Sequence, residues 1–310
     1  MAETARPGEF DLIARLLAPI ARDPAALGLT DDAAVLDVPA GRQIVATADA
    51  LVADVHFRAE DPPDAIAEKA LAVNLSDIAA MGGEPLGHLL TAAWPAGLAY
   101  DWIEAFCAGL GAAGERWGSA LLGGDTVATP GPLTLSVTAL GTVPTGRALT
   151  RAGARPGDVL CVSGPIGDAA LGLKRLKAGA GNDDAAAQRY LRPVPRLDLG
   201  HQLVGHATAC LDVSDGLVAD AGHIAEVSRV AVVIEAEKVP LSEVAQAALA
   251  TGEIDLAGLL TGGDDYELLF TAPDASHGVE IGRVEAGEGV RVVDGKGQPM
   301  ALTDTGWRHF

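Results

Sequence analysis

The most apolar stretch with helical spacing runs from Ala70 to Gly83, and two polar residues interrupt it on one face. The spacing predicts a helix that begins near Pro63 and ends at the glycine pair, since glycine commonly terminates helices. Its other positions are almost all apolar, so we expect burial on most of its circumference. Asn74 and Asp77 lie one turn apart, and a buried carboxylate is costly unless it is paired or coordinates a metal. An isolated Asp near a helix end can also cap a turn, so both interpretations stay open at this point.

Further apolar runs predict strands and helices that intermix along the rest of the chain. Several of the short runs end in an acidic residue, a pattern that recurs in both halves. The expected strands lie within residues 30–36, 43–49, 88–93, 120–126, 133–142, 159–163, 209–217, 231–235, 259–270 and 290–293. The expected helices lie within residues 9–17, 62–83, 100–117 and 169–177 and in the segment that carries Asp220 and His223. Residues 178–187, which are small and polar, are expected to form a loop.

The segment Gly146–Asp158 is basic and rich in glycine and proline, which is typical of a connection between domains. A chain of 310 residues is long enough for two domains of ordinary size. We therefore expect one domain at residues 1–148 and another at residues 149–310. Because strands and helices intermix in both halves, the expected fold class is α/β or α+β.

Charge and composition exclude several classes of partner. With 22 Lys and Arg against 42 Asp and Glu, the net charge is −20, which disfavours nucleic acid or an anionic membrane as the main partner. Binding of a phosphorylated substrate would then need divalent cations. The three cysteines are isolated in sequence, so neither a disulfide framework nor a zinc site is indicated. No apolar run near residues 1–10 indicates a signal peptide, and none approaches the roughly 20 residues of a membrane span, so we expect a cytoplasmic protein.

Six acidic residues share one context, because they follow small or apolar residues and often adjoin glycine. They are Asp32, Asp49, Asp77, Asp125, Asp212 and Asp215. Strand ends and glycine turns direct side chains toward a cleft, and carboxylates that converge there repel one another unless cations are present. Mg²⁺ takes hard oxygen ligands and bridges carboxylates to phosphates, so these residues predict a magnesium-dependent phosphate site. For any one of them, capping of a turn is the commoner role.

Familiar nucleotide-binding motifs are missing or misplaced. No G-x-x-x-x-G-K-[ST] sequence occurs, and the only G-x-G-x-x-G string, Gly109–Gly114, falls inside an expected helix and not in a strand-to-helix turn. The protein-kinase motifs and the EF-hand loop are also absent from the sequence. A phosphate enzyme of this kind would rely on metal ions and glycine-loop amides, with Arg147 and Arg151 among the few cations available.

Eight motifs follow one another along the chain. They are Asp31–Ala34, Thr47–Asp49, His56–Phe57, Ala72–Gly82, Gly123–Thr126, Gly146–Arg151, Asp212–Leu217 and Gly262–Leu268. Taken in this order, they resemble the motifs of the thiamine-monophosphate kinase family, within the wider superfamily of aminoimidazole ribonucleotide synthetase and selenophosphate synthetase. The resemblance extends from Gly8 to Phe310.

The resemblance implies a phosphotransferase that uses ATP and Mg²⁺ to convert thiamine monophosphate to thiamine diphosphate. It implies an N-terminal α/β domain whose sheet pairs in a homodimer, a C-terminal α/β domain, and a site in the cleft between them. The implied metal ligands are Asp32, Thr47, Asp49, Asp77, Asp125, Asp212 and Asp215, and Asp77, Asp125 and Asp215 among them would be catalytic. The implied nucleotide contacts are Gly124, Arg151 and Ser214, and the implied thiamine contacts are His56, Asp264 and Trp307.

Two other functions stay open from the sequence. One is another ATP-dependent enzyme of the same superfamily, although selenophosphate synthetases carry a Cys and a Lys near the N-terminus and the first such residues here are Cys107 and Lys69. The other is a non-catalytic nucleotide or metal sensor. Three positions, Thr30, Ala48 and Asp264, depart from the family pattern, which usually has Gly, a hydroxyl residue and Glu there.

Overall fold

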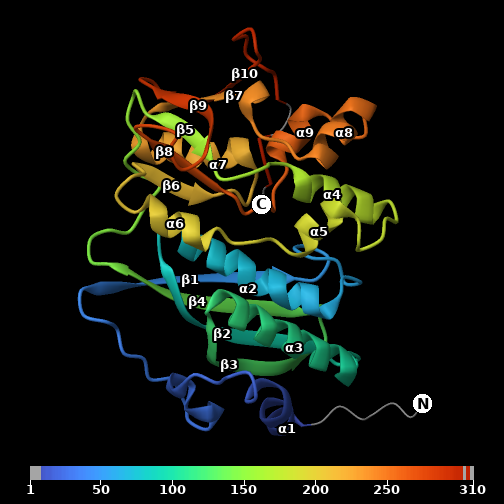
Figure 1. Ribbon diagram of the computed structural model, residues 1–310. Helices are drawn as coiled ribbons and strands as arrows, with labels where there is room; N and C mark the ends of the chain where they lie inside the picture. Colours follow the sequence, from blue (N-terminus) through green and yellow to red (C-terminus); the bar gives the residue numbers. More distant parts are fainter. Residues whose placement is uncertain (1–7, 303–304, 308–310) are drawn as a thin grey trace. The chain divides into compact units, whose positions relative to one another are not determined.

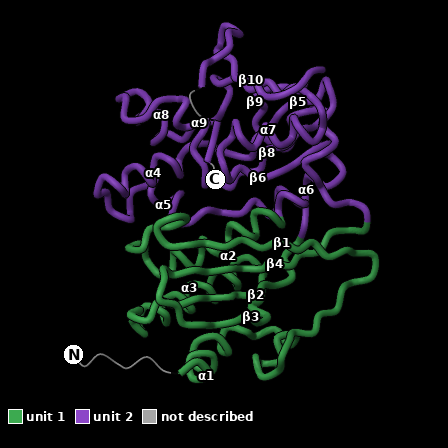
Figure 2. The backbone as a smooth tube through the Cα atoms, turned by 180° about the vertical axis from the view of Figure 1, so that it is seen from behind, with its two compact units in different colours: residues 1–78, 84–145 green, residues 79–83, 146–310 purple. Residues whose placement is uncertain are grey.

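The computed structural model describes residues 8–302 and 305–307, so the last part of the family resemblance, residues 308–310, lies outside the described residues. Two compact units make up the chain (Figure 2). The first contains residues 1–78 and 84–145, and the second contains residues 79–83 and 146–310. The boundary between residues 148 and 149 that the sequence suggests stays a prediction.

The first unit is built on a four-stranded sheet with the order β1-β4-β2-β3. Strand β4 pairs antiparallel with both β1 and β2, and β3 adds parallel to β2. Two long helices, α2 and α3, run side by side along one face of this sheet (Figure 1). The bounds of these elements are β1 (Arg42–Val52), α2 (Pro63–Ala80), β2 (Glu84–Pro95), α3 (Tyr100–Trp117), β3 (Ala120–Thr129) and β4 (Thr134–Pro144).

Both long helices form where the apolar spacing predicts them. Helix α3 buries Ile103, Phe106 and Leu110 and stops at Gly118, whose left-handed backbone (φ 65°) suits a residue without a Cβ. Helix α2 is buried around most of its circumference, and even Asn74 is 0% exposed. The prediction of a buried polar residue inside an apolar helix is therefore confirmed.

The start of the chain differs from the prediction in two ways. Residues 9–17 form helix α1 (Glu9–Leu12) that continues as a π-helix, η1 (Ile13–Leu17). The prediction of a strand within residues 30–36 is wrong. After the 3-10 helix η2 (Pro24–Leu29) the chain is irregular and largely exposed, and Val35 is 68% exposed. The N–H of Val35 bonds to the carbonyl of Ala25 and not to a strand, so this short apolar run has no sheet partner there.

The second unit contains a six-stranded sheet with the order β10-β7-β9-β5-β8-β6. The β10–β7 pair is parallel and the other pairs are antiparallel. The strands are β5 (Val159–Val162), β6 (Ala209–Asp212), β7 (Ala231–Glu235), β8 (Leu268–Ala272), β9 (Val279–Glu285) and β10 (Gly289–Val293). Alternate side chains of β5 and β8 point to opposite faces, and each face packs into a separate apolar core. Helix α7 (Leu217–Ser228) covers one face, and α6 (Leu197–Leu203) covers the other.

Four further helices pack beside this sheet, around a small core of their own. They are α4 (Asp168–Lys177), α5 (Ala185–Leu191), α8 (Glu243–Thr251) and α9 (Leu256–Thr261), and a 3-10 turn, η3 (Ala236–Lys238), follows β7. The prediction of a loop at residues 178–187 is wrong at its C-terminal end. The Asp184 side chain accepts hydrogen bonds from the backbone N–H groups of Ala186 and Ala187, and α5 begins there. The sequence patterns also missed α6, α8 and β9.

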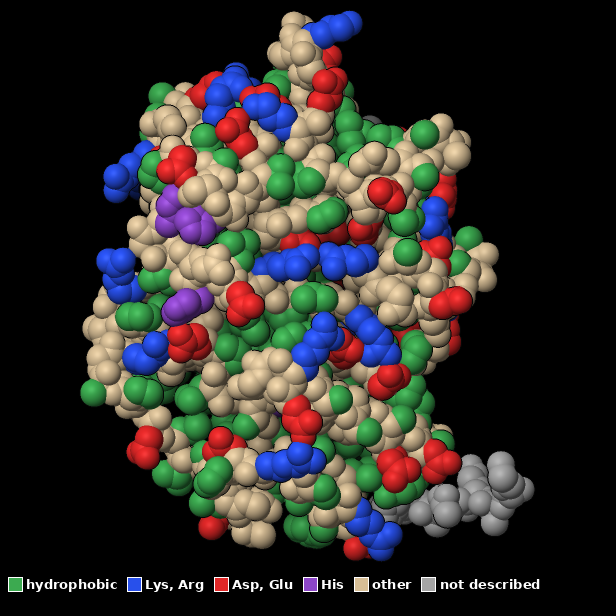
Figure 3. Space-filling model, in the orientation of Figure 1, with side chains coloured by type: hydrophobic (Ala, Val, Ile, Leu, Met, Phe, Trp, Pro, Cys, Tyr) green, Lys and Arg blue, Asp and Glu red, His purple; other side chains and the backbone are tan. Residues whose placement is uncertain are grey.

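Charged side chains of both signs cover the face drawn in Figure 3, and Lys and Arg gather in a short strip over the segment that joins α5 to α6. Among the helices of residues 8–302, none has the length and apolar character that crossing a membrane would require.

Candidate functional site

In the first unit, β1 and α2 bring together part of the predicted acidic set. The Thr47 hydroxyl donates a hydrogen bond of 2.5 Å to Oδ2 of Asp77. The backbone N–H of Asp49 donates to the side-chain oxygen of Asn74 over 3.0 Å, and the Asn74 amide donates to the carbonyl of Ala70. Asn74 and Asp77 therefore lie on the helix face that meets β1, and the buried amide fixes the backbone of the strand that carries Asp49.

The electrostatics of this group favour a cation. Burial and, second, the negative charge of Asp77 raise the pKa of Asp49 to about 6. Both carboxylates are only half-buried, so their oxygens can still reach a ligand. Two carboxylates and a hydroxyl are hard oxygen donors, the ligands that Mg²⁺ prefers. Thr47, Asp49 and Asp77 thus fit a magnesium ion, and a bound cation would relieve the repulsion that raises this pKa.

The two remaining acids of this unit are not joined to that group by the contacts described above. Asp32 is exposed in the irregular segment after η2. Asp125 is exposed on β3, and its Oδ1 accepts a hydrogen bond from the N–H of Thr126. The strand register places Gly124 on β3 level with Asp49 on β1, with β4 and β2 between them. Three spacings between neighbouring strands separate the two backbones by about 14 Å. The predicted roles of Asp32 and Asp125 as metal ligands stay predictions.

Gly124 itself is required by the packing of the sheet. Its φ is +146°, and a Cβ there would lie 1.7 Å from the carbonyl oxygen of Leu90 on the neighbouring strand. His56, in the turn after β1, accepts a hydrogen bond at Nδ1 from the N–H of Val52. In the neutral ring its proton is therefore on Nε2. The nucleotide contact predicted for Gly124 and the thiamine contact predicted for His56 are not tested by these local roles.

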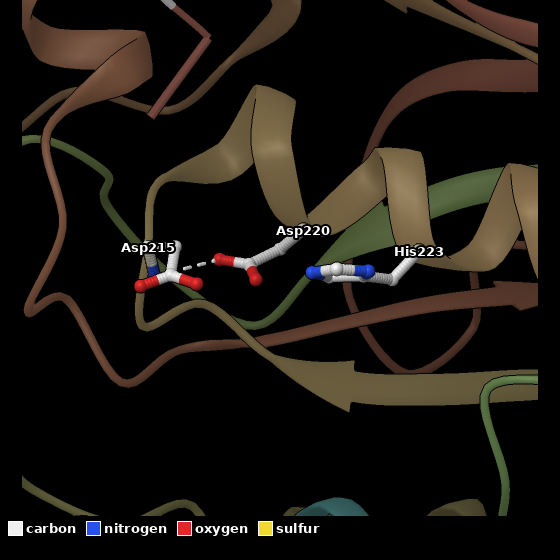
Figure 4. Close-up of side chains that lie close together, drawn as sticks. All are labelled: Asp215, Asp220 and His223. Atoms are coloured by element: carbon white, nitrogen blue, oxygen red, sulfur yellow. Dashed lines mark hydrogen bonds between the residues drawn. The ribbon is translucent and has the colours of Figure 1, made fainter. Parts of the chain in front are cut away.

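In the second unit, the loop between β6 and α7 forms around the carboxylate of Asp220. A single oxygen, Oδ2, accepts hydrogen bonds from the backbone N–H groups of Ser214, Asp215 and Gly216 over 3.0, 3.0 and 3.1 Å. Figure 4 shows Asp220 reaching from the first turn of α7 back to Asp215. Asp220 is 3% exposed, and it determines how Ser214 and Asp215 are presented.

This loop also concentrates negative charge. Burial and then the charges of Asp212 and Asp215 raise the pKa of Asp220 to about 7. One ligand atom from each of Asp215, Asp220 and His223 lies within 4.8 Å of the other two. Figure 4 shows these three side chains lying close together. The set could hold a divalent cation, with carboxylate oxygens and one imidazole nitrogen as donors. Sequence reasoning placed Asp220 and His223 on a helix but missed their role. The available signal was an Asp in the first turn of a helix that follows an Asp-Gly turn.

Other predicted residues of this unit adjoin the same loop. The N–H of Asp264 donates to the carbonyl of Ser214 over 2.8 Å, and the N–H of Trp307 donates to the carbonyl of Asp215 over 2.9 Å. The Tyr266 hydroxyl donates to Oδ1 of Asp264. The Trp307 side chain is 54% exposed, so it offers an aromatic surface. Arg151 is exposed in the segment before β5, and its carbonyl accepts a hydrogen bond from the Ser228 hydroxyl.

The chain is similar to known proteins over nearly its whole length. Residues 30–143 match the family described as AIR synthase related protein, N-terminal domain, and residues 155–295 match its C-terminal domain counterpart. The thiamine-monophosphate kinase of Caulobacter vibrioides is 45% identical over 98% of this chain and 92% of its own length. The chain belongs to the thiamine-monophosphate kinase family. The Escherichia coli kinase is 38% identical over 98% of both chains.

Solved structures of the family agree with the fold. The thiamine-monophosphate kinase from Stenotrophomonas maltophilia has a TM-score of 0.84 at 41% identity, over 94% of this chain and 98% of that one. A structure of AaThiL complexed with AMPPCP and TMP has a TM-score of 0.81 at 35% identity, over 98% and 97% of the two chains. The hydrogenase maturation protein HypE, at 20% identity and a TM-score of 0.81, shares the fold. The two-domain α/β fold that the sequence resemblance implies is thereby confirmed.

Proposed function

We propose that this protein transfers the γ-phosphoryl group of ATP to the phosphate of thiamine monophosphate, giving thiamine diphosphate. The observation that carries the proposal is the nearly full-length similarity to thiamine-monophosphate kinases, at 45% and 38% identity. A related structure that holds AMPPCP and TMP supports both substrates. The oxygen donors gathered at Thr47, Asp49 and Asp77 support the chemistry.

Mg²⁺ is part of this proposal, with Thr47, Asp49 and Asp77 as ligands from the first unit and Asp212 and Asp215 as ligands from the second. Asp32 and Asp125 belong to the same proposed set. When bound, Mg²⁺ neutralises phosphate charge and favours in-line transfer. The chain's own contribution is to fix the backbone that carries these carboxylates, through Asn74 behind Asp49 and through Asp220 behind Asp215.

No strong general base is required for this reaction. A phosphate monoester has a second pKa near 6, so the acceptor oxygen is already a nucleophile at neutral pH. Alignment of two anions is then the main task of the protein. We propose that Gly124, Arg151 and Ser214 contact the nucleotide and that His56, Asp264 and Trp307 contact thiamine, whose cationic ring suits the exposed indole.

A homodimer is also part of the proposal. Strand β1 lies at one edge of the four-stranded sheet, and Ile44 on it is 47% exposed. An exposed apolar edge strand of this length favours pairing with another chain. Sedimentation equilibrium of the purified protein tests the dimer, and a monomer at micromolar concentration would contradict it.

A cytoplasmic location stays a prediction.

The deciding experiment follows thiamine diphosphate by chromatography after incubation with ATP, Mg²⁺ and thiamine monophosphate. We expect product that depends on Mg²⁺, is abolished by EDTA and is lost in Asp77→Asn. The matched control is Asp37→Asn, since Asp37 is exposed and lies outside the proposed set, and it should keep wild-type activity. Absence of product from folded wild-type protein that still binds an ATP analogue would overturn the assignment.

A further inference from the structure

A buried carboxylate in the second unit holds two arginines. Glu267, which precedes β8, is 0% exposed. Its Oε1 accepts hydrogen bonds from Nη2 of Arg189, over 2.9 Å, and from Nη2 of Arg196. Its Oε2 accepts from Nε of Arg196, over 2.7 Å, and from the Ser163 hydroxyl. Every lone pair of this carboxylate therefore has a donor.

The backbone around Glu267 is adapted to this cluster. The N–H of Leu268 donates to the Ser163 oxygen over 2.8 Å, which fixes that hydroxyl between the ends of β5 and β8. A Cβ at Gly164 would lie 2.8 Å from both carboxylate oxygens, so only glycine leaves room for the carboxylate. Arg196 follows Pro195 in the segment before α6, and the proline ring fixes the φ angle of the residue that leads into Arg196.

The charges of this cluster do not cancel. One bidentate arginine and one hydroxyl would neutralise and solvate a single buried carboxylate. Among the groups bonded to Glu267, a second arginine leaves one surplus positive charge, in a chain whose net charge is −20. The neighbouring Asp265 is buried, and burial raises its pKa well above the usual value, so it adds little negative charge. Both arginine side chains are 29% exposed, so both remain partly accessible to solvent. The strip of Lys and Arg over the α5–α6 segment in Figure 3 lies in this region.

We propose that Arg189 and Arg196 form a binding site for a phosphate group, with Glu267 holding the two guanidinium groups in place. Arg196 donates to Glu267 through Nε and Nη2, which leaves Nη1 to bind a phosphate oxygen. Arg189 donates through Nη2, which leaves Nε and Nη1 for the same purpose. Guanidinium N–H groups match the spacing of phosphate oxygens, which a lysine does not reproduce. The identity of the phosphate rests on the proposed function: it belongs to thiamine monophosphate or to ATP.

A second arginine cluster in the same unit serves as a comparison. Arg175 pairs with Glu253 through Nε and Nη2 and with Asp184 through Nη1, and its side chain is 23% exposed. Here Arg175, with Lys174 nearby, meets two carboxylates, so no positive charge is in surplus and no anion is expected. Arg175→Gln is therefore a matched control for Arg189→Gln: each removes a half-buried arginine from an ion cluster.

The experiment measures binding by calorimetry, in the presence of Mg²⁺, for two pairs of ligands: thiamine monophosphate with thiamine, and AMPPCP with adenosine. The ratio of the affinities within each pair isolates the phosphate contribution. We expect Arg189→Gln to lower one of these ratios by about 10-fold, the effect of one charge-assisted hydrogen bond. Arg175→Gln should leave both ratios within about 2-fold of wild type, because its cluster carries no surplus positive charge. The pair that responds identifies the source of the phosphate.

Arg189→Gln leaves Glu267 paired with Arg196 and Ser163, so the fold should persist. If that variant does not fold, Arg189→Lys is tested instead, because it keeps the charge but removes the planar guanidinium group. We expect it to lower the same affinity ratio by a smaller factor. Unchanged ratios in a folded Arg189 variant would overturn the proposal. The result is separable from the proposed function, because an effect of Arg189→Gln on the ratio for AMPPCP and adenosine can appear even if the wild-type protein makes no thiamine diphosphate.

Discussion

The hydroxyl of Thr47 donates a hydrogen bond of 2.5 Å to a carboxylate oxygen of Asp77, which links β1 to α2. A second link lies close to it, from the N–H of Asp49 to Asn74. The strand and the helix therefore hold two carboxylates close together, with the Asp77 carboxylate oriented by Thr47 and the Asp49 backbone held by Asn74. This relation explains why a polar pair persists inside an otherwise apolar helix.

Thr47→Val should weaken Mg²⁺ binding more than it affects stability. The substitution removes the hydroxyl that orients Asp77 but keeps the shape of the side chain. We expect the Mg²⁺ concentration for half-maximal rate to rise about 10-fold, the effect of losing a hydrogen bond to a charged group. Thr47→Ser should restore it. The control is Thr134→Val on β4, whose hydroxyl donates to the carbonyl of Pro132. Equal Mg²⁺ dependence in Thr47→Val and wild type would contradict this role.

Asp220→Ala should cost both stability and activity. Three backbone N–H groups would lose their acceptor, and we expect about 3 kcal/mol of lost stability from these unpaired donors. Asp220→Asn keeps an oxygen acceptor and removes the charge, so it should retain the fold. Urea denaturation measures the first effect, and the affinity for AMPPCP reports whether Ser214 and Asp215 are still presented correctly. If Asp220→Ala matched wild type in both measurements, the positioning role would be wrong.

Gly124→Ala should destabilise the first unit strongly. The added Cβ would meet the Leu90 carbonyl at 1.7 Å, so β2 and β3 would have to separate. We expect a loss of about 3 kcal/mol or more. Gly118→Ala is the matched control, because Gly118 also has positive φ but a Cβ there would meet no atom within 4 Å. That substitution should cost only about 1 kcal/mol. Thermal unfolding distinguishes the two, and equal effects would refute the steric explanation.

His88 should make stability depend on pH below neutrality. Burial lowers its pKa to about 4, whereas the unfolded value is near 6.5. The unfolded chain therefore binds more protons between these values, and stability falls as the pH is lowered through this window. The difference of about 2.5 pH units corresponds to about 3 kcal/mol at 1.36 kcal/mol per unit.

His88→Asn provides the test of that dependence. The variant should be less stable at pH 7, because it opens space beside Ser119, but its melting temperature should change less between pH 7 and pH 5 than that of the wild type. The slope of the melting temperature against pH is the diagnostic quantity. A variant with the wild-type slope would show that other groups determine the acid sensitivity.

Local patterns were sufficient to predict most of the regular structure. Apolar spacing predicted α3 at its observed bounds and predicted α2 up to the glycine pair, since a helix buries a continuous face that recurs every few residues. Short apolar runs predicted most strands, because a strand in a sheet also buries apolar side chains at regular positions. The strand expected within residues 30–36 failed because a strand needs a partner, and the hydrogen bond from Val35 to Ala25 replaces one.

The site depended on tertiary structure to a greater degree. The sequence identified six acids of one kind, but Asp49 and Asp77 are brought together across 28 positions while Asp32 and Asp125 are exposed elsewhere in the first unit. It did not reveal that Asp220 holds the Ser214–Gly216 loop or that Glu267 holds Arg189 and Arg196 from more than 70 positions away. Periodicity records which face of an element is buried, and this is a local property. Which polar groups meet is set by strand register and helix packing, which join residues distant in the chain.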